Sequence, residues 1–324
     1  MAWREFRRGK RSKADVQQFE FNLEDNLFKI HRELATGAYT NEPYISFYIT
    51  DPKLRHIHKA SVRDRVVHQA VFRVLYPMFD TGFVFDSYSC RVGKGTHRAV
   101  TRLEQFLRQA SHNNIRLVYA LKCDIRKFFD SLDKDILFSL VKNKIADGRL
   151  LSLIGSIINS FETRLGKGLP LGNVTSQIFS NIYLNELDQF VKHKLKAKYY
   201  LRYCDDFVVV SNERDYLEGM IPKLNAFLGE RLQLRLHEKK IIIRKYSEGV
   251  DFLGYVSLPH YRVLRTKTKR RMSKKLTRRR LELEQGLLNE PSFRQSLASY
   301  LGVLQHCCGF GLKQRLLKIA DKSV

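Results

Sequence analysis

Two short apolar runs flank a pair of adjacent carboxylates, and this pattern constrains the fold more than any other feature of the chain. Tyr199–Tyr203 and Phe207–Val210 are separated only by Cys204, Asp205 and Asp206, which predicts a tight β-hairpin with the acidic pair at its tip. Adjacent carboxylates between hydrophobic strands repel each other and are costly to remove from water. Taken alone, such a pair is most simply a polar turn, but a bound divalent cation would also offset that cost.

A third carboxylate, Asp124, follows a second apolar run. Leu117–Cys123 has the composition of a buried strand, and Asp124 stands directly at its end. Carboxylate oxygens suit Mg²⁺ or Mn²⁺ rather than zinc. Two such ions about 3.5–4 Å apart would activate an attacking 3′-hydroxyl and stabilise a leaving pyrophosphate. We therefore predict that Asp124, Asp205 and Asp206 form a catalytic, metal-binding set.

The overall charge indicates a polyanionic partner. The 324 residues include 58 Lys and Arg against 33 Asp and Glu, a formal charge of +25, which favours nucleic acid or a membrane surface as the partner. No apolar run approaches the roughly 18–20 residues of a transmembrane helix, and no apolar stretch follows the basic N-terminus as in a signal peptide. The five cysteines show no C-x-x-C spacing, so we expect neither a zinc site nor disulfides. A cytoplasmic nucleic-acid-binding protein without membrane contact is the prediction.

Hydrophobic periodicity predicts a mixed helix and strand chain. Asp133 is the expected N-cap of one helix. Helices are predicted over 15–35, 63–79, 97–110, 134–145, 174–195 and 215–230. Besides the strands above, we predict strands over Tyr44–Ile49 (ending at Asp51-Pro52), Leu234–Leu236, Ile241–Arg244 and Phe252–Val256, the last three completing one sheet with the hairpin.

Near residue 260 the composition shifts to a basic, helical segment. Residues 265–280 contain ten Lys or Arg and no acid, dense enough to follow several phosphates and to make binding steeply salt-dependent. A disordered basic tail is the alternative, but the apolar pattern that follows favours a small helical bundle. The candidate nucleic-acid-binding residues here are Lys269, Arg270, Arg271, Lys274, Lys275, Arg278, Arg279 and Arg280.

Tyr203-Cys-Asp-Asp206 resembles the Y-x-D-D box of reverse transcriptases. Further motifs resemble those of the bacterial, group II intron-like branch and occur in the family's order over roughly residues 40–310. They are Arg63–Ala70, Asp86–His97, Asp124 with Phe128-Phe129, Gly168–Gln177, and Phe252-Leu253-Gly254. The resemblance implies an α+β right-hand polymerase fold, with fingers and an antiparallel-sheet palm over 1–260 and a basic helical thumb over 261–324. It implies an RNA-directed DNA polymerase that binds template RNA, a primer or cDNA strand, and deoxynucleotides.

The same resemblance implies roles for individual residues. Asp124, Asp205 and Asp206, helped by the carbonyl of Ile125, would hold two Mg²⁺ ions, with Mn²⁺ possible. The implied nucleotide-binding residues are Lys53 and Arg55 on the triphosphate, Phe129 as a steric gate against the 2′-hydroxyl, Leu171, Gly172 and Gln177 beside the nucleotide, and Lys240 as a proton donor to pyrophosphate. Phe252, Leu253 and Gly254 would form the primer grip, and Arg63, Arg65, Arg91 and Lys94 would contact nucleic acid.

Three of these assignments have plain alternatives at the level of sequence. Lys53 and Arg55 could belong to a solvated loop. Lys239 fits the proton-donor position as well as Lys240, and either could be a solvated lysine at a strand edge. Phe128 and Phe129 could both belong to the core, and one of them must.

One departure from the family pattern concerns the nucleotide-side box. Most reverse transcriptases have Gln-Gly-x-x-x-Ser-Pro there, whereas this chain has Leu171-Gly-Asn-Val-Thr-Ser-Gln177. This resembles the enzymes of diversity-generating retroelements, which copy a template-repeat RNA with frequent errors at adenines and work with a small basic accessory protein. A leucine cannot hydrogen-bond the nucleotide, so discrimination should fall by about 1 kcal/mol.

The resemblance leaves alternative functions open. A retron-like or antiviral-defence reverse transcriptase is one, and a non-catalytic RNA-binding scaffold is another. About 60 residues follow the expected palm, with no ribonuclease H, endonuclease or maturase region among them. We therefore expect a bare polymerase core.

Overall fold

The computed structural model describes residues 1–51 and 53–321. Pro52, where we expected the first strand to end, and the last three residues of the expected thumb lie outside the described residues. The described chain divides into two compact units, considered separately below. The first comprises Met1–Gly93, Cys123–Phe207 and Gly219–Ile241, and the second comprises Lys94–Lys122, Val208–Glu218 and the chain from Ile242 onward.

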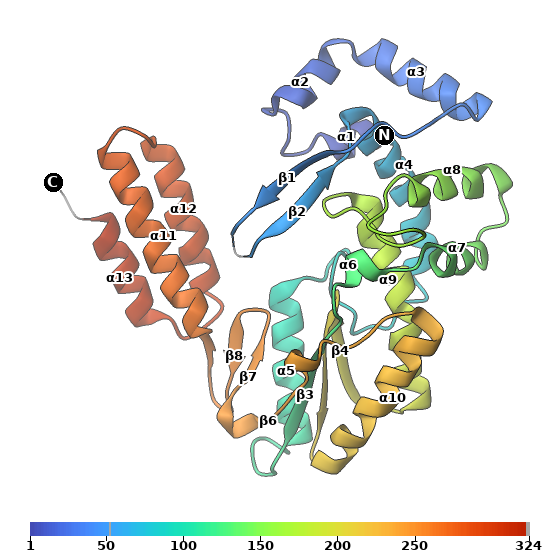
Figure 1. Cartoon of the computed structure of the whole chain (residues 1–324). Helices are drawn as coiled ribbons and strands as arrows, with labels where there is room; N and C mark the ends of the chain where they lie inside the picture. Colours follow the sequence, from blue (N-terminus) through green and yellow to red (C-terminus); the bar gives the residue numbers. More distant parts are fainter. Residues whose placement is uncertain (52, 322–324) are drawn as a thin grey trace. The chain divides into compact units, whose positions relative to one another are not determined.

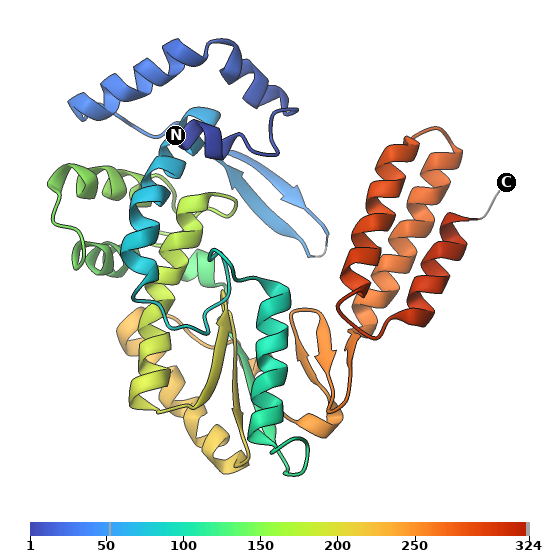
Figure 2. The ribbon, with the colours of Figure 1, turned by 180° about the vertical axis from the view of Figure 1, so that it is seen from behind.

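The first unit is built largely of helices around two long central ones. α4 (Val62–Asp80) and α9 (Val174–Gln189) pack side by side, as Figures 1 and 2 show from opposite sides. Ser61 caps α4 by accepting a hydrogen bond from the Asp64 amide at 3.1 Å. The other helices are α1 (Ala2–Phe6), α2 (Ala14–Phe21), α3 (Leu23–Thr36), α6 (Phe128–Ser131), α7 (Lys134–Lys142) and α8 (Gly148–Asn159). A π-helical turn, η1 (Phe190–Lys194), continues α9.

The predicted helix over 15–35 is wrong as a single element. The structure has α2 and α3 instead, with Asn22 between them in a non-helical backbone conformation. Asparagine competes with helical hydrogen bonding and favours helix ends, and the Asn22 carbonyl accepts the Asn26 amide at 3.0 Å to begin α3. The predicted Asp133 cap is confirmed, because its carboxylate accepts the amides of Asp135 and Ile136 at 3.1 Å.

The central sheet has four strands in the order β4-β5-β3-β6. β4 (Tyr199–Tyr203) and β5 (Asp206–Ser211) are the predicted acidic hairpin, and β3 (Tyr119–Asp124) places Asp124 at its last position. β6 (Ile242–Lys245) pairs antiparallel with β3. The helix predicted over 215–230 is α10 (Arg214–Leu232). The palm hairpin and the strand end that carry the acidic residues are thus confirmed.

Two strand predictions near the palm are wrong. Leu234–Leu236 forms no strand, only an isolated bridge between Leu236 and Ile125. Phe252–Val256 is interrupted because Leu253 and Gly254 both have positive φ, 49° and 89°, which produces a tight turn. The result is a separate three-stranded sheet of β7 (Val250–Phe252), β8 (Tyr255–Ser257) and β9 (Arg262–Leu264).

The first unit also contains a short hairpin, of which the sequence predicts only one strand. β1 (Ile45–Ile49) matches the predicted strand over Tyr44–Ile49. It pairs antiparallel with β2 (Arg55–Lys59), which was not predicted. The register places Tyr48 opposite His56, and the two rings stack with their centroids 4.4 Å apart.

The second unit ends in a three-helix bundle. α11 (Thr266–Glu284), α12 (Glu290–Leu304) and α13 (Phe310–Ala320) lie side by side in Figure 1 and pack on one another. Buried Met272, Leu276, Phe293, Leu304 and Leu316 form the core of the bundle. This confirms the helical bundle over a disordered basic tail. α5 (Thr96–Ala110) and the three-stranded sheet belong to the same unit.

Candidate active site and nucleotide cavity

The end of β3 and the tip of the β4–β5 hairpin are joined by their backbones. The Ile125 amide donates to the Asp205 carbonyl at 3.2 Å, directly after Asp124. Asp124 is buried, whereas Asp205 and Asp206 are half-buried. Burial, and secondly the charge of Asp124, raises the pKa of Asp205. The structure therefore brings Asp124 and Asp205 together in a place where their negative charge is poorly solvated.

Lys240 completes this group. Its Nζ lies 2.6 Å from Oδ2 of Asp124, whereas Lys239 is exposed. The sequence did not distinguish Lys239 from Lys240 as the proton donor. In the structure, Lys240 is the one that contacts Asp124. Its ammonium supplies positive charge to a buried carboxylate, which by itself would be costly to desolvate.

The chemistry of the donor set fits a hard divalent cation. The candidate ligands are oxygen atoms only, which is the donor type that Mg²⁺ and Mn²⁺ prefer. Burial first, and then the charge of Asp124, raises the pKa of Asp205, so a bound cation would offset the cost of ionising this carboxyl. In the described part of the chain, no three His, Cys, Asp or Glu side chains converge as a ready-made metal site. The carboxylates would have to adjust when a cation binds.

A cavity of about 890 Å³ opens in the same unit and is lined mostly by basic and polar residues. Arg55, on β2, lines it, whereas Lys53 is exposed at the tip of the β1–β2 hairpin and is not part of the lining. The other lining cations are Arg126, Lys127, Arg164, Lys167 and Arg235. Apart from Lys167, which lies 3.9 Å from Asp133, these residues form no ion pair within the described chain. Such a cavity is suited to a ligand with several negative charges.

The predicted nucleotide-side box forms one wall of this cavity. Leu169 and Leu171 line it, and the Leu171 carbonyl accepts the His58 amide of β2 at 3.1 Å. Gly172 has φ 112°, and a Cβ there would lie 3.1 Å from the Ile57 side chain. Only glycine tolerates both that backbone and that close approach. Gln177 is exposed on α9 and is not among the lining residues.

Phe129, the predicted steric gate, is half-buried and is not among the residues that line the cavity. Phe128 is buried and contacts the Phe129 ring edge-on at 5.2 Å. The Phe129 carbonyl accepts the Leu169 amide at 2.8 Å, which fixes the short helix α6 to the nucleotide-side box. Of the two phenylalanines, Phe128 is therefore the core residue.

Several predicted nucleic-acid contacts have partners within the protein instead. Arg63 pairs with Glu33 and Asp64, Arg65 with Asp15, and Arg91 with Asp80, and all three guanidinium groups are largely buried. Lys94 is half-buried. Within the predicted primer grip, Phe252 is fully buried and Leu253 and Gly254 form the β7–β8 turn.

The basic face of α11 is divided in the same way. Arg280 pairs with Glu284 and bonds the Ala320 carbonyl, and Arg279 bonds the Ser292 carbonyl at 3.4 Å, so both belong to the bundle. Lys269 and Lys275 are half-buried. The exposed members are Arg270, Arg271, Lys274 and Arg278, the last of which also pairs with Glu282.

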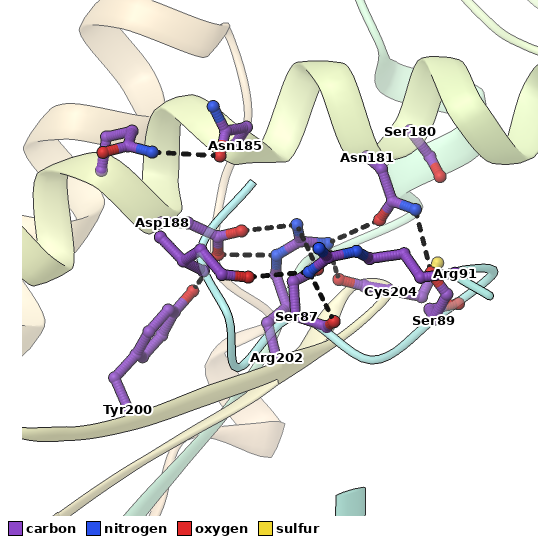
Figure 3. Close-up of polar contacts among 12 residues, drawn as sticks. Ser87, Ser89, Arg91, Ser180, Asn181, Asn185, Asp188, Tyr200, Arg202 and Cys204 are labelled. Carbon is purple, nitrogen blue, oxygen red and sulfur yellow. Dashed lines mark hydrogen bonds and ion pairs between the residues drawn. The ribbon is translucent and has the colours of Figure 1, made fainter. Parts of the chain in front are cut away.

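Sequence reasoning missed a buried ion pair behind the acidic hairpin. Arg202, in β4, and Asp188, in α9, are both fully buried and paired at 2.6 Å (Figure 3). The available signal was a charged residue between the apolar positions Leu201 and Tyr203, and an aspartate within the helix predicted over 174–195. A buried charge normally requires a partner, so the two could have been matched.

Fold and carboxylates together define a right-hand nucleic-acid polymerase. The structure is similar to apo telomerase from Candida tropicalis truncated from its C-terminal domain, with a TM-score of 0.54 at 15% identity, covering 72% of this chain and 59% of that one. Telomerase from Candida albicans in complex with a telomeric RNA fragment gives a TM-score of 0.53 at 12% identity, covering 89% of this chain and 58% of that one. At these identities the likeness concerns the fold alone.

Residues 50–257 match the reverse transcriptase (RNA-dependent DNA polymerase) family, and the chain belongs to that family. It is 27% identical over 263 residues to protein YkfC of Escherichia coli K12, covering 69% of this chain and 68% of YkfC. It is 25% identical over 303 residues to the group II intron-encoded protein LtrA of Lactococcus lactis subsp. cremoris, covering 72% of this chain but only 49% of LtrA. The predicted family and fold are confirmed, whereas these relatives do not single out the diversity-generating branch. None of the described helices has the length and apolar character needed to cross a bilayer.

Proposed function

We propose that this chain is an RNA-directed DNA polymerase that adds deoxynucleotides to a 3′-hydroxyl in the cytoplasm. The observation that carries the proposal is the meeting of Asp124 with Asp205, in which the Ile125 amide bonds the Asp205 carbonyl at 3.2 Å. Asp124, Asp205, Asp206 and the Ile125 carbonyl would hold two Mg²⁺ ions, or Mn²⁺. When bound, such ions activate the attacking hydroxyl and stabilise the leaving pyrophosphate.

We assign separate tasks in this reaction to three further side chains. Arg55, with the unpaired cations of the 890 Å³ cavity, binds the triphosphate, because guanidinium groups match phosphate oxygens in charge and geometry. Lys240 holds a proton at Nζ, next to the reacting centre. Phe129, half-exposed beside the nucleotide-side box, excludes a ribose 2′-hydroxyl.

We assign the chain, within its family, to the diversity-generating retroelements. Leu171 supports this assignment because it lines the same cavity as Arg55 and its side chain has no hydrogen-bonding group. A correct nucleotide then gains no hydrogen bond that a mispaired one lacks. The template would be a template-repeat RNA and the product a cDNA mutated at adenines, with a small basic accessory protein as partner.

Single-nucleotide incorporation tests the polymerase activity. The full chain is given an RNA template, a DNA primer, deoxynucleotides and Mg²⁺, and Asp205→Asn/Asp206→Asn removes the charges with little change of shape. Asp215→Asn, an exposed acid on α10, is the matched control. We expect incorporation by wild type and Asp215→Asn and none by the double variant. Absence of incorporation by the wild type would instead support a non-catalytic scaffold.

Sequencing of the cDNA tests the subclass. Leu171→Gln restores the amide, and Leu171→Met keeps an apolar side chain of similar size as the control. We expect misincorporation opposite template adenines to fall several-fold in Leu171→Gln and to remain in Leu171→Met. Unchanged adenine errors in Leu171→Gln would contradict the proposed mechanism. Faithful copying of adenines by the wild type would favour a retron-like or defence enzyme.

A further inference from the structure

A fully buried polar cluster supports the hairpin that carries Asp205 and Asp206 (Figure 3). At its centre, the Arg202 guanidinium donates two hydrogen bonds to the Asp188 carboxylate, from Nε to Oδ1 at 2.7 Å and from Nη2 to Oδ2 at 2.6 Å. Both side chains are 0% exposed. The Tyr200 hydroxyl donates to Oδ1 of Asp188 at 2.6 Å. The pair therefore has the planar two-bond geometry in which arginine is most strongly fixed.

The remaining Arg202 donors reach outward from this pair. Nη2 donates to Ser87 Oγ at 3.1 Å, and Nη1 lies 3.4 Å from Asn181 Oδ1. Nη1 also donates to the carbonyl of Cys204 at 3.1 Å. The Cys204 carbonyl belongs to the peptide that leads into Asp205, so one arginine connects a rigid helix to the turn that presents the acidic pair.

That turn requires support because of its backbone. Cys204 has φ 55°, a left-handed conformation that a non-glycine residue adopts only at a cost. Two hydrogen bonds from different parts of the chain fix two successive carbonyls of the turn. Arg202 bonds the Cys204 carbonyl, and the Ile125 amide bonds the Asp205 carbonyl.

The backbone of Arg202 is fixed as well. Its amide donates to the Asp86 carbonyl at 3.0 Å, and its own carbonyl accepts the Tyr88 amide at 2.9 Å. A shift of β4 along its own axis would break both bonds. Arg202 thus fixes the position of β4 through its backbone and the tip of the hairpin through its side chain.

Stability alone does not require such a cluster. Replacing a buried ion pair by apolar residues of similar volume is often neutral or stabilising, whereas removing one partner is strongly destabilising. A fork of fixed geometry does confer precise placement of the groups it contacts. We infer that Arg202, held by Asp188, is a positioning residue that fixes the Asp205 carboxylate against Asp124. This inference rests on the proposed polymerase function and adds a residue to it.

The experiment compares two changes to the same cluster. Arg202→Met/Asp188→Leu removes both charges together and with them the bond to Cys204. Tyr200→Phe removes one bond to Asp188 but leaves Arg202 and its bond to Cys204 in place, and it is the matched control. Arg202→Lys keeps a positive charge without the fork. Urea unfolding, Mn²⁺ titration by electron paramagnetic resonance, and single-nucleotide incorporation are measured on each full-length variant.

We expect Tyr200→Phe to unfold at lower urea while keeping wild-type Mn²⁺ affinity and kcat. For the double variant we expect cooperative unfolding, with Mn²⁺ affinity and kcat each about 10- to 100-fold lower, the usual effect of removing support from a ligand. Its KM for the nucleotide should change little, because the cavity is untouched. Arg202→Lys should lose kcat in the same direction.

A double variant that unfolds cooperatively and retains both wild-type Mn²⁺ affinity and wild-type kcat would overturn the inference. So would an equal loss of kcat in Tyr200→Phe, because the cluster would then act through stability alone. Mn²⁺ affinity is measured without any polymerase assay. A wild type that incorporates no nucleotide would refute the proposed function, while the Mn²⁺ titration would still decide the role of Arg202.

Discussion

Lys240 Nζ and Asp124 Oδ2 lie 2.6 Å apart although 116 residues separate them in the chain. The contact depends on a short 3₁₀ turn, η2 (Glu238–Lys240). The His237 amide just before it donates to the Asp124 carbonyl at 2.8 Å, and the Lys240 amide donates to the His237 carbonyl at 2.7 Å. The turn is thereby fixed to the end of β3, and its last residue reaches the carboxylate.

We predict that Lys240→Gln lowers kcat for nucleotide incorporation by about 100-fold. The substitution removes the proton held beside the leaving group, and general acid groups contribute about 10²–10⁴-fold to enzymatic rates. Lys239→Gln removes the same charge from the neighbouring exposed position and should retain wild-type kcat. Pre-steady-state kinetics of one incorporation step measures both. A wild-type rate for Lys240→Gln would contradict this role, and equal losses in both variants would show that Lys240 acts only as a general positive charge.

We predict that Asp205→Asn stabilises the protein at pH 7 while abolishing activity. Burial and the charge of Asp124 raise the pKa of the Asp205 carboxyl, so the folded state binds that proton more tightly than the unfolded state does. The ionised carboxylate therefore costs stability above its folded pKa, and the cost disappears as the pH falls below the unfolded value. Removing the charge should gain on the order of 1 kcal/mol.

Urea denaturation of Asp205→Asn at pH 7 and at pH 3 measures this gain. We expect it at pH 7 and not at pH 3, where the wild-type carboxyl is protonated in both states. Asp215→Asn, an exposed acid, is the control and should change little at either pH. A loss of stability in Asp205→Asn at pH 7 would show that the carboxylate is well compensated in the folded protein.

The parts of the site that the sequence predicted correctly are those fixed by local pattern. Asp205 and Asp206 interrupt two apolar runs, and Asp124 ends a third, so local hydrophobicity alone determines that all three stand at strand ends. The choice between Lys239 and Lys240 could not be made in that way. It depends on the 3₁₀ turn η2 and on how that turn docks against β3.

Two failures of prediction share a cause. Both concern a break whose signal is a single residue within an apolar or helical pattern. Asn22 ends α2 inside a continuous hydrophobic stripe, and Leu253 adopts a left-handed conformation that a branched apolar residue seldom takes. The pairing of Arg202 with Asp188 links a strand to a helix, so neither pattern taken alone specifies it.

We predict that the exposed cations of α11 determine the salt dependence of nucleic-acid binding. Arg270→Gln/Lys274→Gln removes two exposed charges from α11. If both contact phosphates, the slope of log affinity against log salt should become shallower by about 2, nearly one unit for each contact. Fluorescence anisotropy with an RNA–DNA duplex at several salt concentrations measures this slope.

Arg280→Gln is the control for the Arg270→Gln/Lys274→Gln variant. Arg280 pairs with Glu284 and bonds the Ala320 carbonyl within the bundle, so its loss should lower the melting temperature and leave the salt slope nearly unchanged. A slope that is unaffected by Arg270→Gln/Lys274→Gln would place the duplex elsewhere on the protein.

We predict that His68 makes the protein acid-labile below about pH 6.5. The imidazole is 1% exposed within α4, and neither ring nitrogen has a hydrogen-bond partner in the described chain. Burial lowers the pKa of His68 from 6.5 to about 4. Between these values the unfolded chain binds a proton that the folded chain does not, so stability falls as the pH falls and levels off near pH 4. The loss amounts to about 3 kcal/mol.

His68→Leu tests this origin of the acid lability, because leucine fills a similar volume without a titrating group. Urea unfolding from pH 7 to pH 4 should show a shallower decline for His68→Leu than for the wild type. His193→Leu, at an exposed position in the turn after α9, should follow the wild-type profile. Removing two unpaired buried nitrogens should also raise stability at pH 7, since each costs about 1–3 kcal/mol. Identical pH profiles for wild type and His68→Leu would mean that other groups cause the acid unfolding.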